Sequence, residues 1–176
     1  MSRPDQKRIL GSGFPDDDGS AAPAVASALA AYRTGSGPYA AVLAALLDSR
    51  VLVPVVAVLG EVEHDAAGLA HDKSSDMATV LLTGADGRQA LLAFTATDAL
   101  QAWRPDGRPV PVTFRDAARA AVQEGADALV VDVAGPVPFP VQGDDLRAAA
   151  AGYDLAFVGG SSAWVLPADG DSAGPE

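Results

Sequence analysis

The chain contains no cysteine, which excludes disulfide bonds, catalytic thiols and zinc sites built on thiolate ligands. Aromatic residues are also scarce, at 6% of the 176 residues, whereas apolar residues as a whole make up 49%. Because much of that apolar fraction is alanine, we expect a thin, helix-rich core. A chain of this length is most simply one domain with short tails.

Positive charge is the second shortage. The chain has 12 Lys and Arg residues against 23 Asp and Glu residues, for a formal net charge of −11. No basic run compensates for this acidity, which argues against general nucleic-acid binding and against docking on anionic membranes. We therefore expect neither nucleic acid nor membrane among the partners.

Long hydrophobic runs are missing as well. No apolar stretch reaches the ~18 residues expected of a membrane helix, since Pro54 and Gly60 interrupt the best candidate. Basic residues near the start are not followed by the apolar core of a signal peptide. We expect a soluble cytoplasmic protein, with a disordered tail over 1–20, one domain over 21–166 and a disordered acidic tail over 167–176.

The clearest local pattern predicts a β-hairpin that leads into a helix. Residues 77–82 and 90–94 are β-rich apolar runs, and the turn between them contains Asp86 and Gly87, a pair that favours tight hairpins. Both runs are continuously apolar rather than alternating, which predicts a sheet covered on both faces.

Thr95 stands where a helix N-cap is expected, and Asp98 three residues later makes a variant capping box. Leu100 and Trp103 then lie on one side of the following helix. The free N–H groups from Thr95 to Thr97 offer an anion site. We favour the simpler interpretation that Thr95 and Asp98 satisfy these groups themselves.

Before this hairpin, the pattern predicts a helix from Pro23, a break at 35–37 and a second helix from Pro38. Residues 51–59 form a strand candidate. Because proline cannot donate to a ladder, Pro54 predicts an edge strand or a bulge.

After the hairpin, residues 110–112 are extended, and Thr113 with Asp116 forms a second capping-box-like start. This helix should stop at Gly125 and precede a buried strand over 128–133, so that 110–133 resembles a right-handed βαβ unit. The end of the chain is expected to contain an irregular or edge segment at 137–141, a helix at 144–151 and a small hairpin within 157–166. The predicted fold is a single α/β domain with a mixed sheet of about five strands and flanking helices, with α+β as the alternative.

An acidic segment carries both histidines and invites a metal-site interpretation. His64 and His71 are seven residues apart in a glycine-containing segment, which is not the spacing that places two ligands on one helix face. We expect a solvated acidic loop, no metal and no cofactor. The segment's other acidic residues are Glu61, Glu63, Asp65, Asp72 and Asp76.

Lys73 lies beside Ser75 and Asp76, and a lysine next to hydroxyls can act as a base or a phosphate clamp. No Ser-x-x-Lys context is present, so we favour a charged loop in which Asp76 pairs with Lys73 or Arg88. Asp132 ends a buried strand, where ligands gather in open α/β sheets. A lone carboxylate there more often caps a loop. We predict no catalytic residue.

The order Asp-Lys-Ser-Ser-Asp-Met at 72–77, Gly-Ala-Asp-Gly-Arg at 84–88 and Leu-Ala-Phe-Thr-Ala-Thr-Asp-Ala-Leu at 92–100 resembles the SseB N-terminal domain family. The similarity is closest to its single-domain members in actinobacteria. It covers about residues 22–150, including the segments at 51–54 and 127–132. The family's name comes from a link to serine sensitivity in bacteria, and the resemblance implies no particular reaction, cofactor or catalytic residue.

Our leading hypothesis is a non-enzymatic cytoplasmic module that binds a protein partner or a small molecule. The rival is a small enzyme acting on an amino-acid-related metabolite, with Lys73, Asp76 and Asp132 converging in one pocket. A third hypothesis, a structural subunit of a homo-oligomer, predicts an exposed apolar patch. The candidate binding residues are Lys73, Ser75, Asp76, Arg88, Thr95, Thr97 and Asp132.

Overall fold

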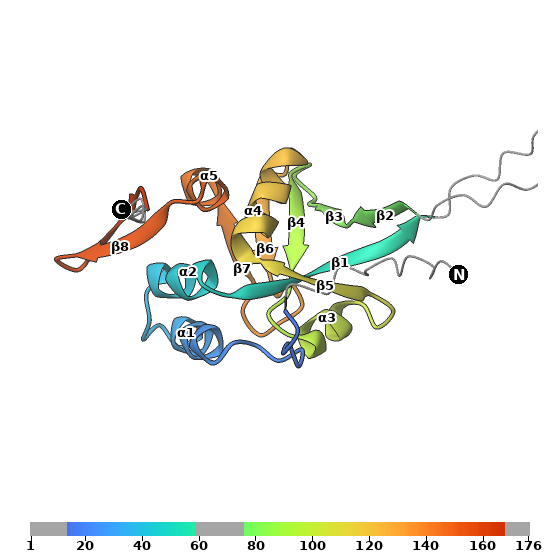
Figure 1. Cartoon of the computed structure of the whole chain (residues 1–176), viewed down its shortest axis with the longest axis horizontal. Helices are drawn as coiled ribbons and strands as arrows, with labels where there is room; N and C mark the ends of the chain where they lie inside the picture. Colours follow the sequence, from blue (N-terminus) through green and yellow to red (C-terminus); the bar gives the residue numbers. More distant parts are fainter. Residues whose placement is uncertain (1–13, 59–75, 168–176) are drawn as a thin grey trace, which may run out of the picture.

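The computed structural model describes residues 14–58 and 76–167, and for 56–58 and 76–79 it describes the backbone alone. Within these residues the chain forms five helices and nine strands (Figure 1). The helices are α1 (Pro23–Arg33), α2 (Tyr39–Leu47), α3 (Thr97–Trp103), α4 (Phe114–Gln123) and α5 (Gly143–Ala151). The strands are β1 (Arg50–Val58), β2 (Asp76–Thr79), β3 (Leu81–Thr83), β4 (Gln89–Ala93), β5 (Arg108–Thr113), β6 (Ala128–Val131), β7 (Phe139–Gln142), β8 (Asp154–Val158) and β9 (Ser161–Val165).

The strands belong to three sheets. One has the order β2-β1-β5, one has the order β3-β4-β6-β7, and β8 with β9 forms a separate hairpin. Among the strand pairs of the described residues, only β4–β6 is parallel. The first two sheets meet at one bridge, where Leu52 and Phe94 each donate a backbone N–H to the other's carbonyl over 2.8 Å. The chain is therefore a single domain of the mixed α/β class, as predicted, with its strands divided among more than one sheet.

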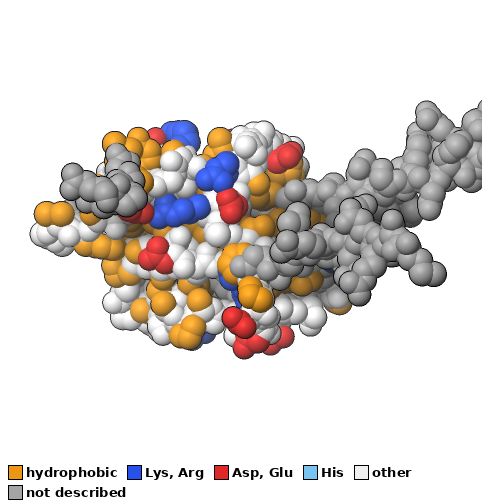
Figure 2. All heavy atoms as spheres, in the orientation of Figure 1, with side chains coloured by type: hydrophobic (Ala, Val, Ile, Leu, Met, Phe, Trp, Pro, Cys, Tyr) orange, Lys and Arg blue, Asp and Glu red, His pale blue; other side chains and the backbone are white. Residues whose placement is uncertain are grey.

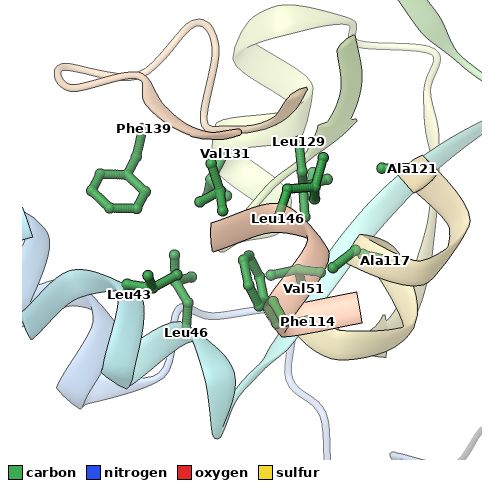
Figure 3. Close-up of a cluster of buried hydrophobic side chains, with 14 of the residues drawn as sticks. Leu43, Leu46, Val51, Phe114, Ala117, Ala121, Leu129, Val131, Phe139 and Leu146 are labelled. Atoms are coloured by element: carbon green, nitrogen blue, oxygen red, sulfur yellow. The ribbon is translucent and has the colours of Figure 1, made fainter. Parts of the chain in front are cut away.

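Alternate residues of the central strands face two separate apolar clusters. Val51 of β1 and Leu91 of β4 face the larger cluster, to which α2, α4 and α5 also contribute (Figure 3). Leu52 and Leu92, one residue further along, face a smaller cluster completed by Leu100 of α3. The predicted covering of both faces is thus confirmed for β4, because a strand buried on both sides needs apolar residues at every position.

The predicted hairpin is only partly right. Residues 77–82 do not form one strand, because the chain changes neighbours at Val80. β2 pairs with β1, and only β3 pairs with β4. The prediction of burial on both faces is wrong for β3, where Leu82 is exposed.

Pro54 lies in a central strand, which contradicts the prediction of an edge. Backbone groups point to alternate sides of a strand, so the side of β1 that bonds Phe94 through Leu52 is also the side that Pro54 faces. Pairing on that side passes from Phe94, opposite Leu52, to Thr79, opposite Val55. The missing N–H of Pro54 therefore falls in the gap between two neighbouring strands, where no ladder bond is required.

The predicted βαβ unit is wrong. Both strands and the helix form, but β5 pairs antiparallel with β1 whereas β6 pairs parallel with β4. The helix signals were correct: the Thr113 hydroxyl accepts the Asp116 N–H at 3.0 Å, and Gly125 has a positive φ of 71°. A strand–helix–strand pattern specifies the elements without specifying which strands become neighbours.

The remaining elements agree with the prediction. Helices α1, α2 and α5 form, β7 is an edge strand, and the terminal hairpin is present but starts earlier, at Asp154. In the described part of the chain, no helix has the length and apolarity needed to cross a membrane. The domain boundaries at residues 20 and 167 stay predictions.

Candidate functional site at the carboxyl ends of β4 and β6

Thr95 and Asp132 follow the two parallel strands and contact each other directly. The register places Ala93 opposite Val131, so β4 and β6 end side by side and the residues that follow them lie close together. The Asp132 carboxylate accepts the backbone N–H of Thr95 at 2.8 Å and its hydroxyl at 2.7 Å. The two residues are only 6% and 7% exposed, and they are the buried polar pair of the described chain.

The backbone at Asp132 is left-handed, with φ of 52°, and Asp132 is the only described residue other than glycine with positive φ. This conformation is uncommon for side chains other than Asn and Asp. The turn is closed by the Gly135 N–H, which donates to the Asp132 carbonyl at 2.8 Å. A β-carbon on Gly135 would lie 3.0 Å from that oxygen, so the turn has little room. Strained backbone of this kind concentrates at functional sites.

Burial raises the pKa of Asp132, while the two hydrogen bonds from Thr95 act in the opposite direction. The rise prevails because removing a carboxylate from water disfavours its charged form. The site therefore holds its proton more tightly than a surface aspartate does.

Arg50 holds the other side of the site. Its guanidinium donates to the Thr95 carbonyl at 2.5 Å, to the Asp17 carboxylate at 2.6 Å and to the Ser20 carbonyl at 2.6 Å. The Arg50 and Asp17 side chains are only 11% and 13% exposed. Residues 14–22, which we call the N-terminal strap, are thereby fixed across the edge of the sheet.

The strap also occupies the start of α3. The Thr97 N–H donates to the Gly19 carbonyl at 2.8 Å. Thr95 does not cap this helix: the N-cap is Ala96, without a side-chain cap bond. The capping-box prediction is wrong because Asp132, distant in sequence, bonds both the N–H and the hydroxyl of Thr95. The N–H groups proposed for an anion at Thr95 and Thr97 are already bonded within the protein.

A cavity of about 210 Å³ lies between α1 and the β6–β7 connection. Its wall is mainly apolar, and Asp132 and Arg33 are its two ionisable residues. The apolar lining is Ala26, Leu29, Ala30, Pro136 and Val137. A second cavity, of about 430 Å³, lies under the strap beside Arg50.

The other predicted residues lie elsewhere in the fold or outside the residues that the structure describes. Arg88 bonds Gln142 at the opposite end of β4, and seven residues of extended chain put it roughly 20 Å from Thr95. Asp76 pairs with Val58, six residues along β1 from Leu52, so its backbone is also roughly 20 Å from the site. Lys73, Ser75 and the histidine segment 61–72 lie outside the described residues. Within the described ranges, no three His, Cys, Asp or Glu side chains cluster as a metal site would require.

Sequence analysis missed Arg50, Asp17 and Arg33. The sequence does point to Arg50, because it is a lone cation beside a long apolar strand and must find hydrogen-bond acceptors if that strand is buried. Asp17 belongs to a run, 16–18, in a stretch expected to be disordered, where nothing in the sequence distinguishes it from its neighbours. Arg33 ends α1, and only the fold brings it to the cavity that Asp132 lines.

Comparison with known proteins gives one match. The family model for the SseB protein N-terminal domain matches residues 25–148. No curated protein and no solved structure matches the chain. The matched region includes β1, both parallel strands and the Thr95–Asp132 contact. The chain belongs to the SseB protein N-terminal domain family.

Proposed function

We propose that the chain is a non-enzymatic cytoplasmic module that binds a small molecule in the cavity between α1 and the β6–β7 connection. The observation that carries this proposal is Asp132, a buried aspartate with left-handed backbone at the carboxyl ends of β4 and β6. It lines a cavity at the position where ligands gather in α/β sheets.

The lining favours a small ligand with charges of both signs. The guanidinium of Arg33 is suited to a carboxylate, which it can bind through two parallel hydrogen bonds. Asp132 lies on the same cavity and supplies carboxylate or carbonyl oxygen to a donor group. The apolar residues between them suit a short hydrocarbon body. An amino-acid-sized zwitterion meets all three requirements within about 210 Å³.

The polar side chains of the site are already hydrogen-bonded within the protein, which favours binding over catalysis. Both carboxylate oxygens of Asp132 are bonded to Thr95, and Arg50 is committed to three acceptors. The rival enzyme hypothesis needs Asp76 within hydrogen-bond reach of Asp132 or one water away. The backbone of Asp76 is roughly 20 Å along β1 from this edge, which favours the binding hypothesis.

The test is a thermal-shift and calorimetric screen of the purified full chain against free amino acids and short organic acids. A ligand at 100 times its dissociation constant should stabilise the protein by about 2.7 kcal/mol. Arg33→Ala should remove that stabilisation without changing the melting temperature of the free protein, because Arg33 is exposed.

Arg104→Ala is the matched control, since Arg104 is also exposed but lies beside Asp106 and Trp103. It should leave ligand binding unchanged. Native mass spectrometry of protein purified from its own host provides a second readout. If no compound stabilises the wild type and no small adduct is seen, or if Arg104→Ala weakens binding as much as Arg33→Ala, the proposed site is wrong.

A further inference from the structure

The β8–β9 hairpin carries most of the exposed apolar surface. Of the six large apolar side chains that stand out as exposed in the described residues, four lie at or next to this hairpin: Phe157, Val158, Val165 and Leu166. Phe157 is 54% exposed and Val158 is 73% exposed. The hairpin begins after residue 148, where the family match ends.

The base of the hairpin is firmly attached. Leu155 and Trp164, which lie opposite each other, pack against the main core. The Trp164 indole N–H donates to the Asp145 carboxylate at 2.8 Å, and Arg115 forms an ion pair with Asp154 at 2.6 Å. The distal half projects past α2 and α5 (Figure 1), and hydrophobic side chains lie near its end in Figure 2. The apolar side chains of the distal half are therefore exposed on a hairpin whose base is anchored to the core.

The backbone of the hairpin is also open for pairing. Val158 and Ser161 close a two-residue turn of Gly159 and Gly160, both with positive φ, which is the usual tight hairpin geometry. In such a hairpin the closing pair exchanges hydrogen bonds, and the next pair does not. The N–H and C=O groups of Phe157 therefore point outward from β8, and in the described part of the chain β8 has no strand neighbour other than β9.

We infer that β8 pairs with the β8 strand of a second copy of this chain, antiparallel across a two-fold axis at Phe157. A two-fold contact of this kind uses one patch on both copies and closes on itself. It would extend two marginal two-stranded hairpins into one four-stranded sheet. It would also place the two Phe157 side chains next to each other, a favourable cross-strand aromatic pair.

The open edge of β8 is self-complementary across a two-fold axis, and its lack of charge allows a second copy to approach it. Two chains with net charge −11 repel each other, so they associate most readily through a surface without carboxylates. Residues 155–167 contain no ionisable side chain, and Asp154 at the base is neutralised by Arg115. By contrast, α4 and α5 present arginines and aspartates in close pairs, Arg119 with Asp116 and Arg147 with Asp144.

The test is sedimentation velocity of the full chain over a range of concentrations. The wild type should form a concentration-dependent dimer. Phe157→Lys should abolish it, because two lysines would face each other across the axis, while circular dichroism of the monomer stays unchanged since this side chain is 54% exposed. Val122→Lys is the matched control, because Val122 is an exposed apolar residue on α4, and this variant should still form the dimer.

Cysteine cross-linking supplies a second readout, because the native chain has no cysteine. Directly opposed residues of antiparallel strands have α-carbons about 5.5 Å apart, within the range of a disulfide. Phe157→Cys should therefore form a covalent dimer under mild oxidation much faster than Val122→Cys. A wild type that stays monomeric throughout, or equal cross-linking of the two variants, would overturn the inference.

Discussion

Three structural demands meet at Asp132. It adopts a left-handed backbone, it is buried, and it bonds Thr95 through both carboxylate oxygens. Asn and Asp are the residues that best tolerate such a backbone, and only a side chain with two adjacent polar atoms can hold the Thr95 N–H and hydroxyl together. The structure therefore explains why position 132 requires an aspartate or an asparagine.

Substitution at Asp132 should separate hydrogen bonding from charge. Asp132→Ala leaves a buried N–H of Thr95 without an acceptor, so we expect it to lower the free energy of unfolding by about 2–4 kcal/mol. Asp132→Asn can keep both bonds and should cost less than about 1 kcal/mol. Because burial raises the pKa of Asp132, the charged carboxylate is disfavoured in the folded state, and the wild type should lose stability relative to Asp132→Asn as pH rises through that pKa.

Urea denaturation at several pH values measures both effects. Thr95→Ser, which keeps the hydroxyl, is the control and should behave like the wild type with only a small loss of packing. Equal destabilisation by the alanine and asparagine variants would show that the two hydrogen bonds are not what holds this turn.

At the scale of elements, local patterns predicted helices and strands well but not their neighbours. Apolar periodicity reports which residues are buried, and for that reason α2, α4 and β4 were predicted correctly. It does not report pairing, so the exchange of partners at Val80 and the separation of β5 from β6 were missed. The Thr95–Asp132 contact was missed for the same reason, although both residues were singled out individually.

One carboxylate of α5 takes part in the attachment of the terminal hairpin, beside the core packing and the Arg115–Asp154 pair. Asp145 accepts the Trp164 indole N–H and a hydrogen bond from the Tyr39 hydroxyl. Burial, together with the negative charge of Asp145, raises the pKa of Tyr39. Trp164→Phe keeps most of the packing but removes one charge-assisted hydrogen bond. We expect a loss of about 1–3 kcal/mol in the stability of the hairpin.

Hydrogen exchange measures this loss locally. Amides of β8 and β9 should exchange faster in Trp164→Phe, whereas amides of β4 and β6 should keep their protection, because the hairpin forms a separate sheet that can open independently. Trp103→Phe is the control, since Trp103 packs against the smaller cluster beside Phe94. Uniform loss of protection in both sheets would mean that the hairpin and the body unfold as one unit.

At the scale of the whole molecule, the N-terminal strap connects Arg50, at the start of β1, to Thr97, at the start of α3. The guanidinium of Arg50, through its hydrogen bond, lowers the pKa of Asp17 below the ordinary value of 3.8. A lowered carboxyl pKa contributes stability that is present above the unfolded pKa and is lost as pH falls through the folded one. Attachment of the strap should therefore weaken only in acid, below about pH 4.

Asp17→Asn should reproduce this weakening at neutral pH. The amide keeps an acceptor for Arg50 but loses the charge, and we expect the free energy of unfolding to fall by about 1–3 kcal/mol, as for other hydrogen bonds to charged groups. The difference between wild type and variant should shrink toward zero as pH drops through the folded pKa of Asp17. Limited proteolysis within residues 14–22 should accelerate in parallel, because the strap is held mainly by Arg50 and by the Gly19–Thr97 bond.

Asp18→Asn is the matched control, since Asp18 lies next in sequence and bonds Ser20 rather than accepting from Arg50. It should leave proteolysis of the strap close to that of the wild type. Because the Arg50–Asp17 pair is largely buried, added salt should change its contribution little, unlike that of the exposed pairs on α4 and α5. A stability difference for Asp17→Asn that persists in acid, or disappears in salt, would assign the attachment of the strap to something other than this ion pair.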